Sequence, residues 1–222
     1  MKSAELKNSL LLYAVTDRTW LGKNFCCETL CDAVLQAIEG GATLVQLREK
    51  ELSEKEFLDE AFSIKEICTS KKIPLIINDN VKIAKETDAF GVHIGQSDME
   101  LKEARKILGA KKIIGVSCQT VEQALQAEKN GADYLGVGAV FSTSTKTDAD
   151  NVPLSTLKDI CQSVKIPVVA IGGISLQNMS QLKGSGIAGV SVISAIFAQQ
   201  DICGATKELK SSAEKLFLSF SE

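Results

Sequence analysis

The chain is poor in the residues and motifs on which several common catalytic sites depend. It has one histidine, His93, and no G-x-S-x-G sequence, so a hydrolase triad has little support. No G-x-x-x-x-G-K-S/T sequence occurs, and the one G-x-G-x-x-G match, residues 184–189, precedes a predicted strand instead of following one, which disfavours an open, doubly wound sheet with a nucleotide-binding loop. The seven cysteines form no C-x-x-C pair, so we expect reduced thiols, with Cys26, Cys27 and Cys31 as small buried apolar residues rather than zinc ligands.

Long apolar runs and an excess of charge are also missing. The longest apolar stretches, such as residues 189–198, fall short of the roughly 18 residues that suggest a membrane span. Glu5 and Lys7 interrupt any apolar region of a signal peptide. With 25 basic and 28 acidic residues and a net charge of −3, the chain has no overall field for nucleic acid. We therefore expect a cytoplasmic protein without membrane or nucleic-acid partners, whose anion sites are local groups of Arg and Lys.

Short runs rich in Val, Ile and Leu alternate with longer stretches of helical periodicity. The predicted strands are residues 10–15, 43–47, 74–77, 89–94, 112–116, 133–137, 168–171 and 189–193. The predicted helices lie near residues 26–39, 53–71, 80–86, 99–108, 120–130, 153–163, 176–184 and 195–217. Eight such units in 222 residues predict an α/β fold, a (β/α)₈ TIM barrel that forms a single catalytic domain over residues 1–222. The alternative is the open, doubly wound sheet.

Local start and stop signals support these helices. Ser53 followed by Glu56, and Thr120 before a turn rich in Glu and Gln, fit N-capping preferences. The glycines at 40–41, 109 and 131 are typical of helix ends. The segments GGATLVQL and NGADYLGVG indicate one helix-to-strand connection used twice.

Polar side chains follow several predicted strands, which in a barrel places them together at the carboxyl-terminal rim. In VQLREK, the residues Gln46, Arg48 and Lys50 alternate onto one side, where guanidinium and ammonium groups suit a diphosphate. The alternative is a solvated loop in which Arg48 and Lys50 pair with Glu49 and Glu51.

Two aspartates follow neighbouring strands. Asp79 comes after PLIIN with Asn78 beside it, and Asp98 ends the next loop, so the two carboxylates suit a hard cation such as Mg²⁺. The alternative is helix capping, because each precedes a predicted helix. The lone His93 has apolar neighbours and fits a satisfied core or rim residue better than a base.

The later loops are rich in hydroxyl groups and glycine. The segment GVGAVFSTSTKTD carries Lys146 among hydroxyl side chains, either as an ordinary connection or as donors to a phosphorylated ligand. The segments IGGIS and VSVISAI end the last two strands, where glycine gives a phosphate access to backbone N–H groups and Ser194 is expected to cap a helix. The site thus divides into a basic, metal-assisted part and a neutral part, which suits two phosphorylated substrates.

With these residues in view, the chain resembles the thiamine phosphate synthase (thiamine-phosphate pyrophosphorylase) family. The resemblance runs from about Tyr13 to Ser194 and rests on YAVTDR, QLREK, INDN, GVHIGQSD, IGVSC, the T-x-T-K of FSTSTK, AIGGI and VSVISAI, in that order. The chain departs from the family pattern at Ser142, where the family has proline.

The resemblance implies a transferase that joins an aminomethylpyrimidine diphosphate to a hydroxyethylthiazole phosphate, with release of pyrophosphate and with Mg²⁺ as cofactor. It implies that the pyrimidine diphosphate is held by Gln46, Leu47, Arg48, Glu49, Lys50, Asn78, Ser117 and Lys146. The residues that it implies to be catalytic are Arg48, Lys50, Asn78, Ser117 and Lys146. It assigns the thiazole phosphate to Thr143, Ser144, Thr145, Gly173, Ile193 and Ser194, and the metal to Asp79 and Asp98.

Three other functions stay open from the sequence. A thiazole tautomerase-like barrel would bind the thiazole without joining it to the pyrimidine, and a sensor would bind without turnover. A sugar-phosphate isomerase or epimerase would need a general acid and base across the site. The oligomeric state is not predicted.

Overall fold

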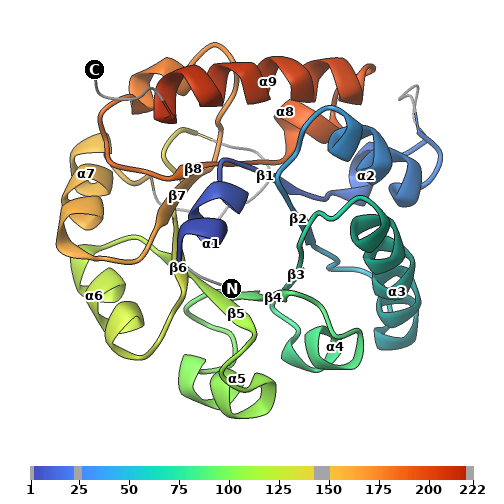
Figure 1. Ribbon diagram of the computed structural model, residues 1–222, viewed down its shortest axis with the longest axis horizontal. Coiled ribbons are helices and arrows are strands. Elements are labelled where there is room, and N and C mark those ends of the chain that lie inside the picture. The colour runs from blue at the N-terminus through green and yellow to red at the C-terminus, as the bar shows by residue number, and fades with distance from the viewer. Residues whose placement is uncertain (1–2, 23–26, 143–150, 219–222) are drawn as a thin grey trace.

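The computed structural model of the chain describes residues 3–22, 27–142 and 151–218. Within them, parallel strands follow one another in chain order and close into a barrel, because β8 pairs with β1 (Figure 1). The strands are β1 (Leu12–Val15), β2 (Leu44–Leu47), β3 (Leu75–Asn78), β4 (Gly91–Ile94), β5 (Ile113–Cys118), β6 (Tyr134–Val137), β7 (Val168–Ile171) and β8 (Gly189–Val192). The predicted (β/α)₈ barrel is confirmed, and the open-sheet alternative is wrong.

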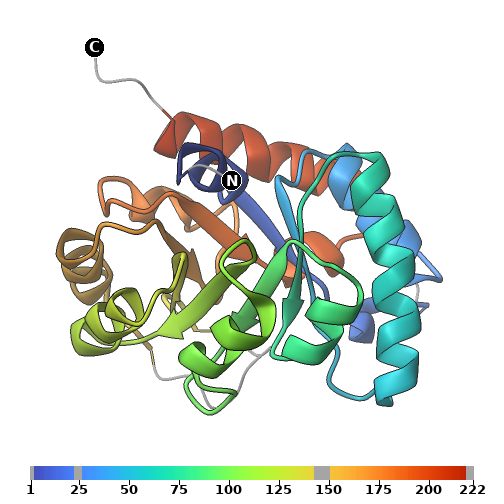
Figure 2. The ribbon, with the colours of Figure 1, turned by 60° about the horizontal axis from the view of Figure 1, so that its bottom comes forward.

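Helices pack around this barrel and, in the case of the first, across one end of it (Figure 1, Figure 2). They are α1 (Ser3–Ser9), α2 (Leu30–Glu39), α3 (Glu54–Ser70), α4 (Val81–Glu86), α5 (Leu101–Leu108), α6 (Val121–Lys129), α7 (Leu154–Ser163), α8 (Ser194–Phe197) and α9 (Ile202–Phe217), with 3₁₀ turns η1 (Arg18–Trp20) and η2 (Met179–Leu182). In the described part of the chain, no helix has the length and apolar character to cross a membrane.

The alternation of side chains along each strand creates two apolar cores. Residues such as Val45 and Ile77 point outward and pack with the helices in one large cluster. Residues such as Tyr13, Leu44 and Ile76 belong to a second cluster that fills the barrel. The barrel is therefore filled by apolar side chains toward the amino-terminal ends of its strands, and polar residues have room only toward the carboxyl ends.

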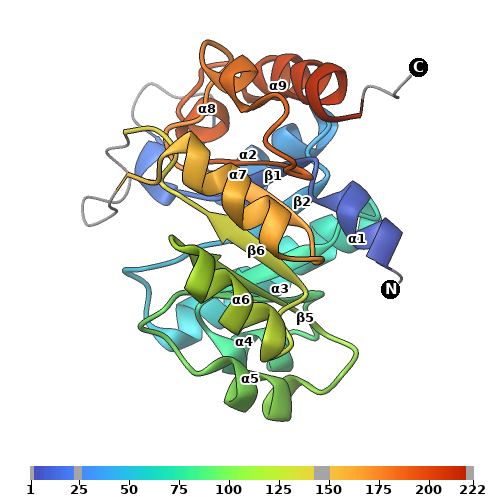
Figure 3. The same ribbon diagram turned by 90° about the vertical axis from the view of Figure 1, so that its left-hand side faces the viewer.

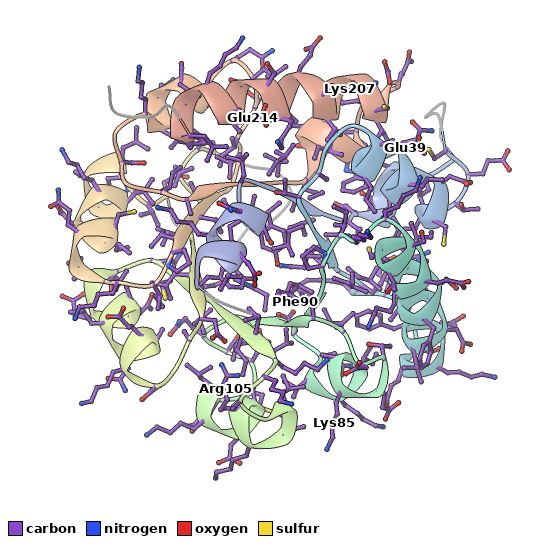
Figure 4. The ribbon with its side chains drawn as sticks, in the orientation of Figure 1. Glu39, Lys85, Phe90, Arg105, Lys207 and Glu214 are labelled. Atoms are coloured by element: carbon purple, nitrogen blue, oxygen red, sulfur yellow. The ribbon has the colours of Figure 1, made fainter. Side chains whose placement is uncertain are left out.

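The amino-terminal end of the barrel is covered by α1, a helix that the sequence patterns did not predict. Leu6 and Leu10 are buried and belong to the interior cluster, and Phe90 packs against the same cluster. Figure 3 shows α1 at one end of the barrel, and Figure 4 shows Phe90 near the centre of that mouth. Apolar side chains thus close the end opposite the loops that follow the strands.

One turn connects helix to strand four times. After α2, α3, α4 and α6, the residues Gly41, Lys72, Asp88 and Gly131 adopt φ values of 103°, 59°, 49° and 94°. The next N–H group then bonds a carbonyl five residues back: Ala42 to Ala37, Ile73 to Cys68, Ala89 to Ala84 and Ala132 to Ala127, at 3.0, 2.9, 3.0 and 3.0 Å. This is the Schellman arrangement, which satisfies helix-terminal carbonyls. The predicted repeat is confirmed and extends to two connections without glycine.

The predicted helix starts are also confirmed. Ser53 Oγ accepts from the Glu56 N–H at 3.3 Å while Glu56 Oε2 accepts from the Ser53 N–H at 3.0 Å, a complete capping box. Thr120 Oγ1 accepts from the Gln123 N–H at 3.2 Å. Capping chemistry therefore fixes where α3 and α6 begin.

Two predicted helices differ from the structure. Only η2 forms within residues 176–184, because the Asn178 side chain bonds the Ser175 N–H at 2.8 Å and the Gly173 carbonyl at 2.8 Å, which competes with helical bonds. The helix predicted over 195–217 is divided into α8 and α9, because Asp201 caps a new start by accepting from the Gly204 N–H at 2.8 Å.

We predict that Lys72→Gly stabilises the protein. Lys72 is exposed and left-handed, so glycine removes backbone strain that exceeds its own entropic cost, raising the free energy of unfolding by about 0.5–1 kcal/mol. Urea denaturation measures the change. The matched control is Lys71→Gly, at the adjacent exposed residue with φ of −95°, which should lower the same free energy. A destabilised Lys72→Gly variant would contradict the strain argument.

Candidate active site

A pocket of about 430 Å³ opens at the carboxyl ends of the strands. Its walls come from β1 to β8 and the loops that follow them, and its floor is the upper layer of inward-facing strand residues. This volume is that of a small-molecule site. The position is the one expected for the active site of a (β/α)₈ barrel.

Most of the predicted site residues meet in this pocket. The predicted residues that line it are Gln46, Arg48, Lys50, Asn78, Asp79, Asp98, Ser117, Gly173, Ile193 and Ser194. They come from six different strands or following loops, so the barrel gathers side chains that are more than a hundred residues apart in sequence.

Six predicted residues are not among the pocket residues. The side chains of Leu47 and Glu49 point to the opposite side of β2 and its extension, because alternation places them out of phase with Gln46, Arg48 and Lys50. Thr143, Ser144, Thr145 and Lys146 lie outside the described residues.

Arg48 and Lys50 line the pocket and form no ion pair with the residues that the structure describes. Among the ion pairs of the described residues, none includes Arg48 or Lys50, so the alternative of a self-paired loop is wrong for this part of the chain. The Thr16 hydroxyl accepts from the Arg48 N–H at 2.9 Å and ties the segment to the loop after β1. Two cations at the mouth of a pocket, neither held in an ion pair, are an anion-binding arrangement.

Behind this basic segment, Arg18 joins two glutamates. Its Nε donates to Glu49 at 2.7 Å and its Nη2 donates to Glu60 at 2.8 Å, and the Glu49 side chain is only 1% exposed. Burial, together with the second carboxyl group of Glu60, raises the pKa of Glu49 to about 7 although Arg18 opposes the shift. Glu49 therefore anchors the loop that presents Arg48 and Lys50.

The two predicted metal-binding carboxylates lie together. Burial and the hydrogen-bonded carboxyl of Asp98 raise the pKa of Asp79 to about 6, although Lys50 opposes this shift. Asn78 Nδ2 donates to Asp79 at 2.6 Å, and the Gly95 N–H donates to Asp98 at 2.7 Å. Two crowded carboxyl groups of this kind are stabilised when a cation binds between them.

The capping alternative for these aspartates is not what the structure shows. The cap of α4 is Asn80, whose Oδ1 accepts from the Ile83 N–H at 3.0 Å, and the residue that precedes α5 is Glu100. Asp79 instead adopts a left-handed φ of 58°, a conformation that costs an aspartate backbone energy and recurs at functional sites.

The donor set around these carboxylates suits a hard divalent cation. The described residues contain no group of three or more His, Cys, Asp or Glu side chains placed to hold a metal. Two carboxylates leave most coordination positions to water or ligand oxygens, as Mg²⁺ prefers. The residues present therefore fit the expected cation.

The opposite wall of the pocket comes from the loops after β7 and β8. Glycine is required at 172 and 173 by the approach of the loop after β6, since a Cβ there would lie 2.5 Å from Ala139 Cα and 2.4 Å from the Ser142 carbonyl oxygen. Phosphate access alone therefore does not explain these glycines. Ser194 is the first residue of α8 and not its cap, which is Ile193, so its expected capping role is wrong although it lines the pocket.

A row of hydrogen bonds forms the floor of the pocket. Gln46 Nε2 donates to the Tyr13 hydroxyl at 2.6 Å, and the Tyr13 and Tyr134 hydroxyls are 2.9 Å apart. His93 Nδ1 lies 2.9 Å from the Tyr134 hydroxyl, and its Nε2 lies 3.0 Å from Ser117 Oγ. These five residues are called the floor chain below. The expectation that His93 is a satisfied core or rim residue is confirmed.

Several pocket residues were not predicted. Tyr13, Gln96, Gln119 and Ser191 line the pocket. Within the described residues, the buried Ser191 hydroxyl has no hydrogen-bond partner, so it is available to a ligand. Strand alternation was the signal that could have found Tyr13 and Ser191, because Tyr13 pairs with Ser191 across β1 and β8 and both face inward.

The family model, the curated relatives and a solved structure at 38% identity agree with one another. The family model described as thiamine monophosphate synthase matches residues 12–196. A thiamine-phosphate synthase from Clostridium beijerinckii is 51% identical over 92% of this chain and 96% of its own length. One from Ruminiclostridium cellulolyticum is 53% identical over 92% of both chains. The solved thiamine phosphate pyrophosphorylase from Pyrococcus furiosus has a TM-score of 0.87 and 38% identity, covering 95% of this chain and 98% of its own.

We predict that Glu49→Gln changes the pH dependence of stability. A folded-state pKa raised to about 7 from an ordinary value of 4.5 adds stability at low pH that is lost as the pH rises through 7. The amide keeps an acceptor for Arg18 but does not titrate, so the variant gains stability relative to the unmodified protein between pH 5 and 8, by at most about 1.4 kcal/mol per pH unit.

Urea denaturation across that pH range makes the measurement. The control is Glu51→Gln, the same chemical change at an exposed neighbour, whose curve should run parallel to that of the unmodified protein. A parallel curve for Glu49→Gln would show that Glu49 is already ionised at low pH.

Proposed function

The chain belongs to the thiamine monophosphate synthase family, and we propose that the pocket at its strand ends holds both substrates of thiamine-phosphate synthesis. That synthesis is the activity of this chain, and it is a transferase reaction. The observation that supports the site most strongly is the meeting of two cations, Arg48 and Lys50, which form no ion pair among the described residues, with two crowded carboxyls, Asp79 and Asp98, in one pocket. A diphosphate held with a divalent cation satisfies all four groups.

In this proposal the pyrimidine diphosphate occupies the side formed by β2 to β5. Arg48 and Lys50 bind its phosphate oxygens, and Ser117 donates a further hydrogen bond to them. Gln46 and Asn78 offer amide groups to the pyrimidine ring. Lys146, outside the described residues, is proposed to add a cation from the loop after β6.

Asp79 and Asp98 are proposed to hold Mg²⁺. When bound, the cation neutralises charge on the diphosphate and so favours its departure as pyrophosphate. Asn78 and the Gly95 N–H orient the two carboxylates through their hydrogen bonds.

The thiazole phosphate is proposed to occupy the opposite side, near β7 and β8. Gly173, Ile193 and Ser194 form this wall and carry no charge, so a phosphate there is bound by backbone and hydroxyl donors. Thr143, Ser144 and Thr145 are proposed to complete this wall, but they lie outside the described residues.

The proposed reaction is a dissociative substitution. The bond from the pyrimidine methylene to the diphosphate oxygen breaks first, Arg48 and Lys50 stabilise the charge that develops on pyrophosphate, and the thiazole nitrogen attacks the pyrimidine cation. That nitrogen has a free lone pair, so no general base is needed, in agreement with the hydrogen-bonded state of His93. Holding both substrates in one pocket removes association entropy worth roughly 7–11 kcal/mol of barrier.

The enzyme is proposed to work in the cytoplasm. Its partners are the two small substrates.

The decisive experiment incubates both phosphorylated precursors with Mg²⁺ and measures pyrophosphate release. We expect release only when both are present, and we expect Lys50→Ala to lower kcat/KM by on the order of 100-fold. Lys207→Ala is the matched control, since Lys207 is an exposed lysine on the outer helix α9 (Figure 4) and should leave kcat/KM unchanged. Binding of thiazole phosphate without pyrophosphate release would instead favour the tautomerase or sensor functions.

We predict that Asp79→Asn weakens the binding of Mg²⁺. The Mg²⁺ concentration for half-maximal rate should then change less with pH than in the unmodified enzyme. With a pKa of about 6, Asp79 is protonated in acid, and the proton competes with the cation. The Mg²⁺ concentration for half-maximal rate should therefore rise below pH 6 by up to about tenfold per pH unit in the unmodified enzyme. Asp59→Asn, on the exposed face of α3, should keep that profile. An unchanged Mg²⁺ requirement in Asp79→Asn would remove Asp79 from the metal site.

A further inference from the structure

The floor chain has a direction that its hydrogen-bond donors define. The Gln46 amide nitrogen is a donor, so the Tyr13 hydroxyl accepts from it. The other described partner of the Tyr13 hydroxyl is Tyr134, and Tyr13 therefore gives its single proton to Tyr134. Tyr134 in turn gives its own proton to His93 Nδ1.

This direction determines which nitrogen of His93 carries hydrogen. A ring that accepts at Nδ1 is neutral and has its proton on Nε2. Nε2 then donates to Ser117 Oγ, which lies 3.0 Å away. The proton of the Ser117 hydroxyl is left to point elsewhere, and Ser117 lines the pocket.

The barrel makes room for this chain at two glycines. A Cβ at Gly115 would lie 2.1 Å from the Tyr134 ring and 2.5 Å from His93 Nδ1, and a Cβ at Gly136 would lie 3.0 Å from His93 Cε1. Any other residue at 115 would displace the tyrosine or the histidine. The absence of side chains at both positions is thus a second, independent sign that the floor chain is built into the fold.

The two tyrosines act in this chain as neutral hydroxyls. Both rings are buried, and burial raises the pKa of the Tyr13 and Tyr134 hydroxyls far above the ordinary value of 10.0. Each therefore keeps one proton to donate and one oxygen to accept, as a continuous chain requires.

We propose that Tyr13, Tyr134 and His93 are positioning residues that turn the Ser117 hydroxyl into a donor aimed at the pocket. Phosphate oxygens at neutral pH accept hydrogen bonds, so Ser117 serves an anionic ligand only as a donor. If the floor chain ran the other way, Ser117 would donate to His93 and offer the ligand a lone pair. The consequence for the diphosphate rests on the role proposed above for Ser117, whereas the direction of the chain does not.

The direct test reads the histidine itself. Because the chain contains one histidine, labelling with ¹⁵N-histidine gives a spectrum of His93 alone. In the full-length protein without ligand at neutral pH, we expect the proton on Nε2, and we expect Tyr134→Phe to abolish that preference while leaving the fold intact. Thr87→Val is the matched control, because it removes a buried hydroxyl that bonds the Ile83 carbonyl at 2.7 Å away from the pocket.

Two results would overturn the proposed direction. One is a proton on Nδ1, alone or in a charged ring, in the unmodified protein. The other is an unchanged tautomer in Tyr134→Phe.

A second measurement tests the effect on Ser117. Calorimetry with inorganic pyrophosphate and Mg²⁺ should show binding about tenfold weaker in Tyr134→Phe, as one hydrogen bond to a charged oxygen is lost. In a Ser117→Ala background, Tyr134→Phe should have no further effect, because the donor that it positions is gone.

Independent losses in the two single variants that add in the double variant would overturn the coupling to Ser117. If the unmodified protein does not bind pyrophosphate while His93 has the expected tautomer, the proposed anion site fails and the direction of the floor chain stands.

Discussion

The site depends on the alternation of side chains along strands that close into a parallel barrel. Closure leaves no strand edge, so every second residue must face inward and every other residue must pack under a helix. Along β2 and its extension, Gln46, Arg48 and Lys50 reach the pocket while Leu47 and Glu49 do not. A shift of one residue in this strand would bury Arg48 and Lys50 under the helices and turn Leu47 and Glu49 toward the pocket.

The pocket holds two cations and two carboxyls whose charges a bound ligand can neutralise. Arg48 and Lys50 have no carboxylate partner among the described residues, while Asp79 and Asp98 crowd each other enough to raise the pKa of Asp79. Outside the pocket, Arg18 is placed between two glutamates and supports the same segment from behind. Among the described residues no ion pair joins these cations to these carboxyls, although Lys50 is near enough to lower the pKa of Asp79, and this arrangement favours an anion and a cation bound together.

Local and periodic features of the fold could be predicted from the sequence, whereas contacts that depend on register could not. Capping by Ser53 and the glycine turns are local, and they were predicted correctly. Whether Asp79 or Asn80 caps α4 depends on a single residue of offset, which periodicity does not resolve. Tyr13 and Tyr134 are 121 residues apart, so their hydrogen bond exists only once the barrel has closed. Glu49 was predicted to bind the substrate because of the motif that contains it. The alternation of side chains along the strand, however, places it on the side away from the pocket.

The short helix α1 determines how substrates and products can reach and leave the pocket. Leu6, Leu10 and Phe90 close the amino-terminal end of the barrel. In the part of the chain that the structure describes, the pocket therefore opens only at the rim formed by the loops after the strands. In the proposed reaction, two substrates and two products use that one opening. In the proposed reaction every substrate must therefore enter, and every product leave, past the loops that carry Arg48 and Lys50.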